Sequence, residues 1–369
     1  MWEIERSATA SPFLIGSQVL GNVDKVHMID QFRGRLPKLV NARFLRDGKL
    51  DVLFRPGILL DSNLVDDIDR RVRGGAVGDG VEQFLRFVLE KQWDVNPLFY
   101  CLEHLSKSSP SIFRKNAIRR LASIIRIHVA DANTFLSTGE LRSDQDLLAG
   151  TLMEGGASSI EELAEKRVDN ILSGYDAAML RDMLEASQVA LIKMVLIEKQ
   201  ELPKASLQEK LKEFHNFVDA VFGVQMAREA HLAAHYFAGL AGSLLGIQAS
   251  TPAERAIRTI RATAWDIFLL RFPEGSLRNS LDVDLMYVAT KEVQLYELGR
   301  LFSLEAVFGD PAGPIPVLAY DLDQIAESAR DRLASLDIPS RPPSSRGSPK
   351  GSPSLLLSAM QRQLGAFCV

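Results

Sequence analysis

A continuous apolar run that stops abruptly at polar residues constrains this chain more than any other feature. The run consists of Leu53-Phe54 and Gly57-Ile58-Leu59-Leu60, and Asp61-Ser62-Asn63 follows it directly. A short apolar run of this kind is typical of a strand that is buried on both faces of a parallel sheet. A second strand is predicted at Asp282–Ala289. Because helical sequence separates the two strands, we predict an α/β fold with a parallel sheet flanked by helices.

Residues from about 140 to 250 have helical patterning almost throughout. Capping boxes at Ser159–Glu162 and Ser206–Glu209 indicate two helix starts, since the Ser and Glu side chains bond to each other's backbone N–H groups. Thr251-Pro252-Ala253-Glu254 indicates another, for a helix that should run to about Phe272. The apolar spacing is that of a helical bundle inserted into the α/β core. Such an insertion offers a surface for a homodimer or a protein partner.

These patterns divide the chain into segments. The first 45 residues show no clear pattern, and a Pro- and Ser-rich stretch at 339–349 cannot bury a core. We therefore expect six parts: an N-terminal addition of unknown role (1–45), the first part of the core (46–135), the helical insertion (136–250), the second part of the core (251–310), a C-terminal helix (311–338) and a mostly disordered tail (339–369). Within the tail, the last apolar piece, Leu355–Val369, is predicted to form a short docking helix.

Composition excludes several classes of function. A formal net charge of -4 excludes a broad basic surface for duplex binding, although it leaves room for a local basic stripe. No Gly-rich phosphate loop followed by Lys and Ser or Thr is present, so we do not expect an NTPase. The longest weakly polar run, Tyr236–Ile247, is too short for a membrane helix, which needs about 20 residues. Two distant cysteines and no visible secretory signal indicate a reducing compartment, and we expect a cytoplasmic protein with no membrane partner.

Two aspartates lie at positions that indicate a function: Asp61 at the end of a strand and Asp266 within an apolar stretch. Asp61 directly follows the first predicted strand, and ligands bind beyond the carboxyl ends of strands in open parallel sheets. The alternative is that Asp61 caps the following helix. Asp266 lies in Trp265–Leu270, which is apolar on nearly every side, and an ionised carboxylate there needs a partner or a metal. The alternatives for Asp266 are an arginine partner or a position facing solvent.

Further acids accompany these two. Glu103 follows Leu102 on a helix that Asn96-Pro97 starts, and Glu292 comes just past the end of the second predicted strand. Asp282 and Asp284 lie near the beginning of that strand and compete with Glu292 for the same role. Asn63 is expected on the same side as Asp61 if the strand continues.

Taken in order, these acids resemble the pattern of the PIN-domain nucleases. Leu59-Leu60-Asp61-Ser62-Asn63 is similar to the end of that family's first strand, and Glu103 is the candidate for its second acid. Trp265-Asp266-Ile267 resembles the third, and Val288-Ala289-Thr290-Lys291-Glu292 resembles the fourth, with Glu in place of Asp. The resemblance covers about 130 residues in two blocks, and the chain departs from compact members by its long section between the second and third acids.

The resemblance implies a PIN-like core and metal-dependent hydrolysis of phosphodiester bonds. Catalysis is then expected from Asp61, Glu103, Asp266 and Glu292, and metal ligation from Asp61, Glu103, Asp266 and Asp284. Hard oxygen ligands suit Mg²⁺ or Mn²⁺. The implied substrate is RNA, as for the toxins and defence proteins of the family. The alternatives are a non-catalytic member that binds nucleic acid or protein, which the substituted fourth acid favours, and a structure-specific DNA nuclease.

A nuclease also needs positive charge for the phosphate backbone. Lys115, Arg119 and Arg126 lie within about 40° of one another on a helix that Ser109-Pro110 starts. Arg258 and Arg261 precede Asp266 on its own helix. With Asn63, we expect Lys115, Arg119, Arg258 and Arg261 to bind substrate. The alternative for either group is a solvated helix face.

Overall fold

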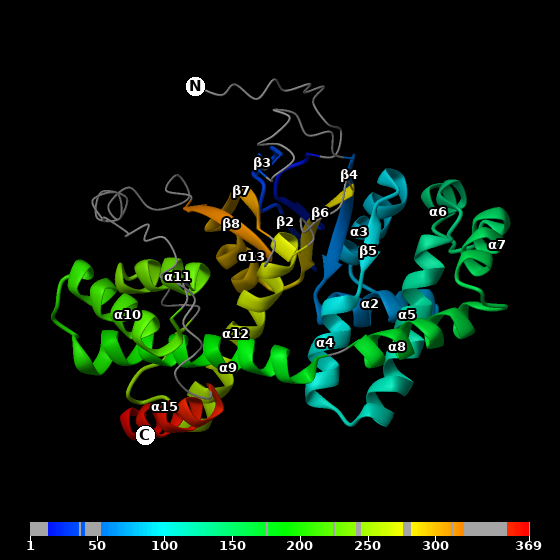
Figure 1. Ribbon diagram of the computed structural model, residues 1–369. Helices are drawn as coiled ribbons and strands as arrows, with labels where there is room; N and C mark the ends of the chain where they lie inside the picture. Colours follow the sequence, from blue (N-terminus) through cyan, green and yellow to red (C-terminus); the bar gives the residue numbers. More distant parts are fainter. Residues whose placement is uncertain are drawn as a thin grey trace. The chain divides into compact units, whose positions relative to one another are not determined.

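A computed structural model describes residues 14–36, 38–40, 53–174, 176–223, 226–240, 245–275, 282–310, 313–320 and 353–368. The chain divides into two compact units (Figure 1). Unit 1 contains Met1–Tyr175 and Leu269–Val317, and unit 2 contains Asp176–Phe268 and Leu318–Val369. Each unit is built from two separate stretches of the chain.

The main element of unit 1 is a five-stranded sheet of order β1-β2-β6-β4-β5. The strands are β1 (Gln18–Leu20), β2 (Val26–Ile29), β4 (Leu53–Leu60), β5 (Asp94–Asn96) and β6 (Asp282–Thr290). Strand β4 runs parallel to both β5 and β6, but β2 is antiparallel to β6 and β1 is antiparallel to β2. The α/β class is confirmed, whereas the expectation of an all-parallel sheet is wrong, because two N-terminal strands form its antiparallel edge.

The two strands predicted from the sequence are neighbours in this sheet. Their parallel register runs without a break from Leu53↔Asp282 to Leu60↔Ala289. Figure 1 shows β4 and β6 side by side near the middle of the sheet. Because both strands point the same way, the residues that follow Leu60 and Ala289 lie side by side. They are at the carboxyl ends of the two strands, which form one edge of the sheet.

Side chains of alternate residues pack on opposite faces of the sheet. Ile58, Leu60, Tyr287 and Ala289 are buried in one apolar cluster together with residues of helices α2 (Ser62–Val72), α3 (Asp79–Lys91) and α5 (Pro110–His128). The opposite face meets α13 (Val293–Arg300) at Gly299, where a Cβ would crowd the side chain of Ile29. The central strands are therefore covered on both faces, as their unbroken apolar run requires.

The N-terminal segment is part of the sheet and not a separate addition. The backbone N–H groups of Asn22, Val23 and Asp24, in the turn between β1 and β2, donate to the carboxylate of Asp79 at distances of 2.6, 3.3 and 3.1 Å. Asp79 is the first residue of α3. The expectation for residues 1–45 is thus corrected for their described part, because β2 pairs with β6 and the turn is bonded to a helix.

A second sheet has the order β3-β7-β8. Its strands are β3 (Lys38–Val40), β7 (Phe302–Asp310) and β8 (Gly313–Tyr320), and β3 runs parallel to β7. The predicted C-terminal helix at 311–338 is wrong for Gly313–Tyr320, which form a strand. The rest of that segment lies outside the described residues.

The other helices of unit 1 lie in sequence between strands β5 and β6. They are α4 (Leu98–Lys107), α6 (Ala132–Thr138), α7 (Gln145–Glu154) and α8 (Ile160–Gly174). The predicted start of α5 is confirmed, with Ser109 at the N-cap position and Pro110 as the first helical residue. Helix α8 packs on α5, and its Leu163, Ala164 and Val168 belong to the same apolar cluster as the sheet.

In its described part, unit 2 is mainly helical, and it also contains the end of strand β8, residues 318–320. It comprises α9 (Ala177–Leu196), the π-helical segment η1 (Ile197–Glu201), α10 (Leu207–Phe222), α11 (Ala227–Phe237), the first part of α12 (Ala253–Gly275) and α15 (Pro353–Phe367). The predicted capping box of α10 is confirmed, with Ser206 and Glu209 bonded in both directions. The helices of the expected insertion, residues 136–250, fall into both units, since α7 and α8 belong to unit 1.

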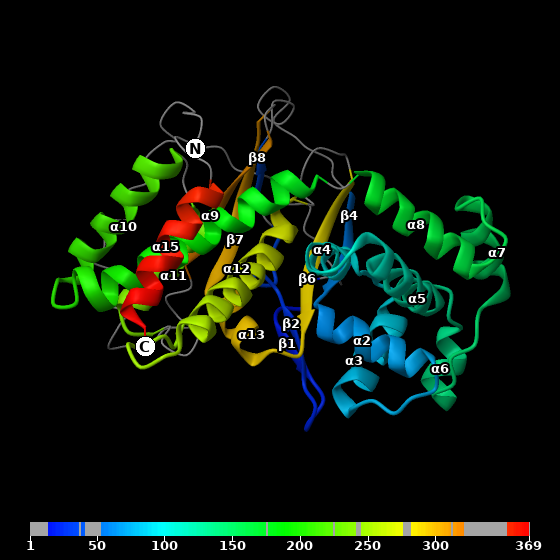
Figure 2. The same cartoon turned by 90° about the horizontal axis from the view of Figure 1, so that it is seen from below.

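Helix α15 confirms the short docking helix predicted at the last apolar piece of the chain, and for these residues it corrects the expected disordered tail. Residues 353–367 form a helix that packs against α9, and Figure 2 shows the two side by side. Leu364 is fully buried and Met360 nearly so. The remainder of the expected disordered tail, 339–352, lies outside the described residues. Within the described residues, no helix has the length and apolar character needed to cross a bilayer.

Candidate functional site

The carboxyl ends of β4 and β6 bring Asp61 and Thr290 together. The Asp61 N–H donates to the carbonyl oxygen of Ala289 at 3.0 Å, which extends the ladder between the strands by one residue. The Thr290 hydroxyl donates to Asp61 Oδ2 at 2.9 Å, and the Ser62 N–H donates to Asp61 Oδ1 at 2.7 Å. Asp61 is also the N-cap of α2, so the capping alternative is confirmed. Both carboxylate oxygens are held by hydrogen bonds.

Glu292 joins this edge through Asn63. Its backbone N–H donates to Thr290 Oγ1 at 3.0 Å, and Asn63 Nδ2 donates to Glu292 Oε1 at 2.8 Å. The expectation that Asn63 follows the strand is wrong, because α2 begins at Ser62 and Asn63 lies in its first turn. Asn63 nevertheless links the two chain segments that carry Asp61 and Glu292.

Glu103 reaches the same edge from α4. The Ser62 hydroxyl donates to Glu103 Oε2, and Lys107 Nζ lies 2.5 Å from Glu103 Oε1. Helix α4 packs against β4 and α2, which places Glu103 next to the residue that follows Asp61. One oxygen of Glu103 is therefore paired with a cation and the other accepts a hydroxyl.

Shared hydrogen-bond partners connect the three acids, since Ser62 bonds to both Asp61 and Glu103, and Thr290 bonds to both Asp61 and Glu292. Burial raises the pKa of Asp61 to about 6, and the negative charges of Glu292 and Glu103 act in the same direction. The hydrogen bonds from Thr290 and Ser62 oppose this shift without cancelling it. Asp61 is 7% exposed, so its charge is poorly solvated. Ionised Asp61 therefore lacks compensation, and a bound cation would supply it.

The structure separates Asp284 from this edge. It lies in β6 opposite Arg55, six residues before Thr290 and so about 20 Å away along the strand at 3.3 Å per residue. Asp284 cannot share a metal with Asp61, and this expectation is wrong. The reason is the direction of the strand: acids at its beginning and at its end lie at opposite edges of the sheet.

Asp266 and the arginines before it belong to unit 2. Asp266 is half-buried on α12, and its side chain has an interaction partner. Arg258 and Arg261 are exposed on the same helix. Lys115 and Arg119 lie on α5 in unit 1, where both are exposed. The acid cluster described for unit 1 thus contains Asp61, Glu103 and Glu292, three of the four expected catalytic acids.

Several polar neighbours of the cluster were not expected from the sequence. Thr290, Ser62 and Lys107 bond directly to its carboxylates, and only the position of Thr290 within the Val288–Glu292 pattern could have indicated it. His27 pairs in register with Thr290 on the adjacent strand. It is buried, its ring packs on Tyr296 at 4.7 Å between centroids, and neither ring nitrogen has a hydrogen-bond partner in the described part of the chain.

The donor set of the cluster suits a hard cation, since it offers carboxylate, amide and hydroxyl oxygens. Among the described residues, however, no three His, Cys, Asp or Glu side chains stand at the spacing of a complete metal site. Like charges repel, and Glu103 is held by Lys107 and Ser62. The arrangement is a set of oxygen ligands around a buried acid, whose side chains would have to move to coordinate one ion together.

The fold and this edge define a mixed α/β protein with carboxylates gathered beyond the ends of two parallel strands. In open α/β sheets this is the position where ligands bind. Comparison of the chain with protein-family models, with curated proteins and with solved structures gives no match.

Proposed function

We propose that this protein is a metal-dependent nuclease that hydrolyses phosphodiester bonds at the edge formed by Asp61, Glu103 and Glu292. The observation that carries the proposal is the buried carboxyl of Asp61, whose pKa of about 6 reflects burial and two neighbouring acids. A structural N-cap needs no such neighbours. Acids with a perturbed pKa at the carboxyl ends of parallel strands are typical of functional sites.

In this proposal, some residues of the cluster orient the acids and others bind the substrate. Thr290 and Ser62 hold the two oxygens of Asp61, so that its carboxylate has one orientation. Asn63 holds Glu292 and carries a neutral donor into the site. Lys107 is paired with Glu103. If the Glu103 side chain turned to bind the metal ion, the ammonium group of Lys107 would be available to a phosphate.

The proposed cofactor is Mg²⁺ or Mn²⁺, held by Asp61, Glu292 and Glu103. When bound, such an ion activates water and neutralises charge on the phosphate and on the leaving oxygen. The proposed substrate is RNA, and this rests on the resemblance of the acid pattern to PIN-domain nucleases.

Cleavage of labelled single-stranded RNA in the presence of Mn²⁺ or Mg²⁺ tests the proposal. We expect cleavage by the purified protein and a loss of roughly a hundredfold or more in Asp61→Asn and in Glu292→Gln, the size expected for a group that acts in the transition state. The matched control is Glu90→Gln, because Glu90 is an exposed acid on α3 whose ion pair in the described part of the chain is with Lys91. Asp266→Asn tests the remaining acid expected from the sequence.

Two results would contradict this assignment. Cleavage of single-stranded DNA with RNA untouched would support the DNA-directed alternative. Binding of nucleic acid without cleavage of either substrate in any divalent metal would support a non-catalytic binding protein. That second candidate is favoured by one observation: Glu103 is already paired with Lys107.

A further inference from the structure

A groove of about 520 Å³ lies in unit 1 between the end of α2, α5 and α8. Its apolar lining comes from Val72, Ile118 and Ala122. Its polar lining consists of Arg73, Lys115, Arg119, Ser123, Arg126 and Glu161. Four of these residues are basic, in a chain whose formal net charge is -4. The groove is therefore a local concentration of positive charge.

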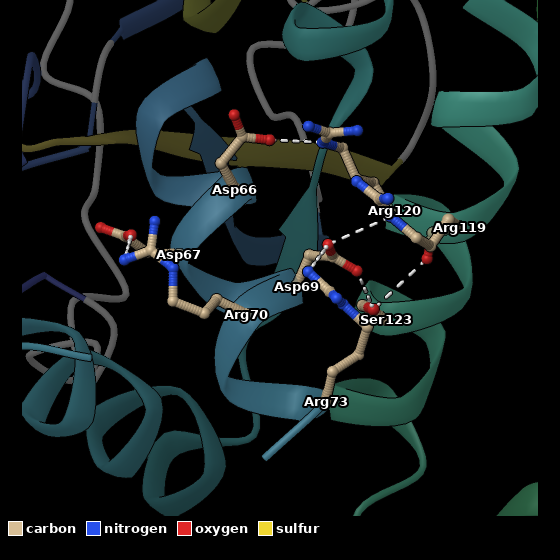
Figure 3. A network of polar contacts seen from close by, with 8 residues as sticks. All are labelled: Asp66, Asp67, Asp69, Arg70, Arg73, Arg119, Arg120 and Ser123. Carbon is tan, nitrogen blue, oxygen red and sulfur yellow. Dashed lines mark hydrogen bonds and ion pairs between the residues drawn. The ribbon is translucent and has the colours of Figure 1, made fainter. Parts of the chain in front are cut away.

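A buried acid holds two of the arginines in place. Asp69 of α2 is 2% exposed, and its Oδ2 lies 2.9 Å from Arg73 Nη2 and 3.2 Å from Arg119 Nε. The Ser123 hydroxyl donates to Asp69 Oδ1 at 2.9 Å. Figure 3 shows Asp69 between α2 and α5, with the two guanidinium groups meeting at its carboxylate. The buried carboxylate of Asp69 thus fixes both guanidinium groups, while about half of each arginine side chain stays exposed.

The remaining cations give the groove an excess of positive charge. Lys115 is exposed and has no ion-pair partner in the part of the chain that the structure describes. Arg126 pairs with Glu161, the one acid among the described residues that line the groove. The four basic side chains outnumber the two acids that contact them, Asp69 and Glu161. Each arginine has five N–H donors, of which the ion pairs use only some.

We infer that this groove binds the phosphate backbone of single-stranded nucleic acid. Fixed guanidinium groups suit phosphate because their donors match two of its oxygens. A positively charged groove that follows the backbone is the usual means of binding a single strand. A duplex would need a broader basic surface than one groove provides in a chain of net negative charge.

The position of the groove relates it to the acid cluster of the same unit. Asp61 directly precedes α2 and Arg73 directly follows it, so the two are about 18 Å apart along the helix at 1.5 Å per residue. A stacked strand covers that distance with about five nucleotides at 3.4 Å each. The inference rests on the proposed function in one respect, since a strand that occupies the groove would also reach the proposed site of cleavage.

Binding of a fluorescein-labelled oligouridylate tests the inference on the full-length protein. The probe has about ten nucleotides, twice the estimated span, and anisotropy is measured in EDTA so that no cleavage occurs. We expect Lys115→Glu to weaken binding about tenfold and to lower the slope of log affinity against log salt by about 0.7, because one phosphate contact is lost. Lys115→Arg should bind like the wild type.

A second variant changes affinity in the opposite direction. Glu161→Gln removes the acid from the groove wall, and we expect it to tighten binding about threefold, since Arg126 is released and repulsion of phosphate is reduced. A misfolded protein would not gain affinity. The matched control is Lys204→Glu, the same charge change at an exposed lysine of unit 2 that does not line the groove.

The outcomes separate this inference from the proposed enzyme. If Lys115→Glu and Glu161→Gln both bind as the wild type does, the groove assignment is overturned, whatever the cleavage assay shows. Equally tight binding of poly-L-glutamate would also overturn it, because any polyanion would then suffice. If both variants change affinity as expected while the wild type cleaves nothing, the groove inference holds and the nuclease proposal fails.

Discussion

At the scale of single residues, the carboxyl of Asp61 has two functions that conflict. Its oxygens cap α2 and accept a hydrogen bond from Thr290, which favours the ionised form. Burial and the neighbouring charges of Glu292 and Glu103 favour the protonated form and prevail. The protein therefore keeps an acid whose ionisation destabilises the folded state without a cation.

This conflict predicts the pH dependence of stability. The pKa of Asp61 rises from 3.8 to about 6 on folding, equivalent to roughly 3 kcal/mol. Because the folded-state value is the higher one, this contribution is present below about pH 4 and is lost as pH rises through about 6. In metal-free buffer, we expect Asp61→Asn to raise the unfolding free energy at pH 7.5 by up to roughly 3 kcal/mol and to change it little at pH 4. Chemical denaturation across this range measures both values.

Asparagine also caps helices well, so the comparison isolates the charge. Glu90→Gln serves as the control, since it removes an acid that is exposed on the surface of α3. Mn²⁺ should raise the Tm of the wild type at pH 7.5 and leave that of Asp61→Asn unchanged, because only the ionised carboxylate of Asp61 serves as a ligand for the ion. An Asp61→Asn protein that is less stable than the wild type at pH 7.5 would contradict this account of the site.

At the scale of elements, close backbone contact joins α3 to the turn between β1 and β2. Gly80 lies in the first turn of α3, and a Cβ there would overlap the carbonyl oxygen of Asp24. Asp79, one residue earlier, accepts three backbone N–H groups from the same turn. Gly80 permits the close approach of α3 to the turn, and the hydrogen bonds to Asp79 stabilise it. Together they attach the antiparallel edge of the sheet to a helix.

Replacement of Gly80 tests that contact against helix propensity. In an isolated helix, Gly→Ala is stabilising by about 1 kcal/mol. At Gly80 we expect the opposite, a loss of about 2 kcal/mol or more, because the methyl group must displace backbone atoms. Gly150→Ala is the control, since Gly150 lies within α7 with no neighbour in reach of a Cβ, and it should stabilise the protein. Urea denaturation of both variants gives the sign, and a stabilised Gly80→Ala would show that the contact is absent in solution.

At the scale of the whole molecule, neither compact unit is a continuous stretch of sequence. Strand β6 lies between β2 and β4, yet it comes from residues 282–290, after the chain has passed through unit 2. It supplies Thr290 and leads directly to Glu292. The acid cluster therefore cannot form until the two separate stretches of unit 1 have been brought together.

This topology predicts the behaviour of fragments. A polypeptide of residues 1–175 contains β1, β2, β4 and β5 but lacks the strand that joins β2 to β4. We expect it to unfold without a cooperative thermal transition, because the apolar run of β4 would have one unpaired edge. Co-expression with residues 176–369 should restore the transition, as followed by circular dichroism. A sharp melting curve for residues 1–175 alone would show that β6 is dispensable.

Much of the secondary structure could be predicted because its causes are local. The apolar run of β4, the N-terminal proline of α5 and the capping box of α10 each act within a few residues of sequence. The helix at the last apolar piece of the chain, Leu355–Val369, was predicted from the sequence, whereas strand β8 was missed, since it carries no strong local signal. Of the candidate site, Asp61, Glu103 and Glu292 could be selected by their positions relative to strands and helices. Ser62 and Lys107 could not, because their importance depends on which side chains they meet, and for Thr290 only its position within the Val288–Glu292 pattern gave an indication.

The sequence by itself determined the α/β class, the central pair of strands and several helix starts. These follow from hydrophobic periodicity and from capping, which need no distant partner. Only the tertiary structure decided that two N-terminal strands close the sheet, that Asp284 lies at the wrong edge, and that Asp69 holds Arg73 and Arg119 beside a groove. Strand order and side-chain pairing depend on contacts between residues far apart in the chain, and such contacts form only when the whole unit folds.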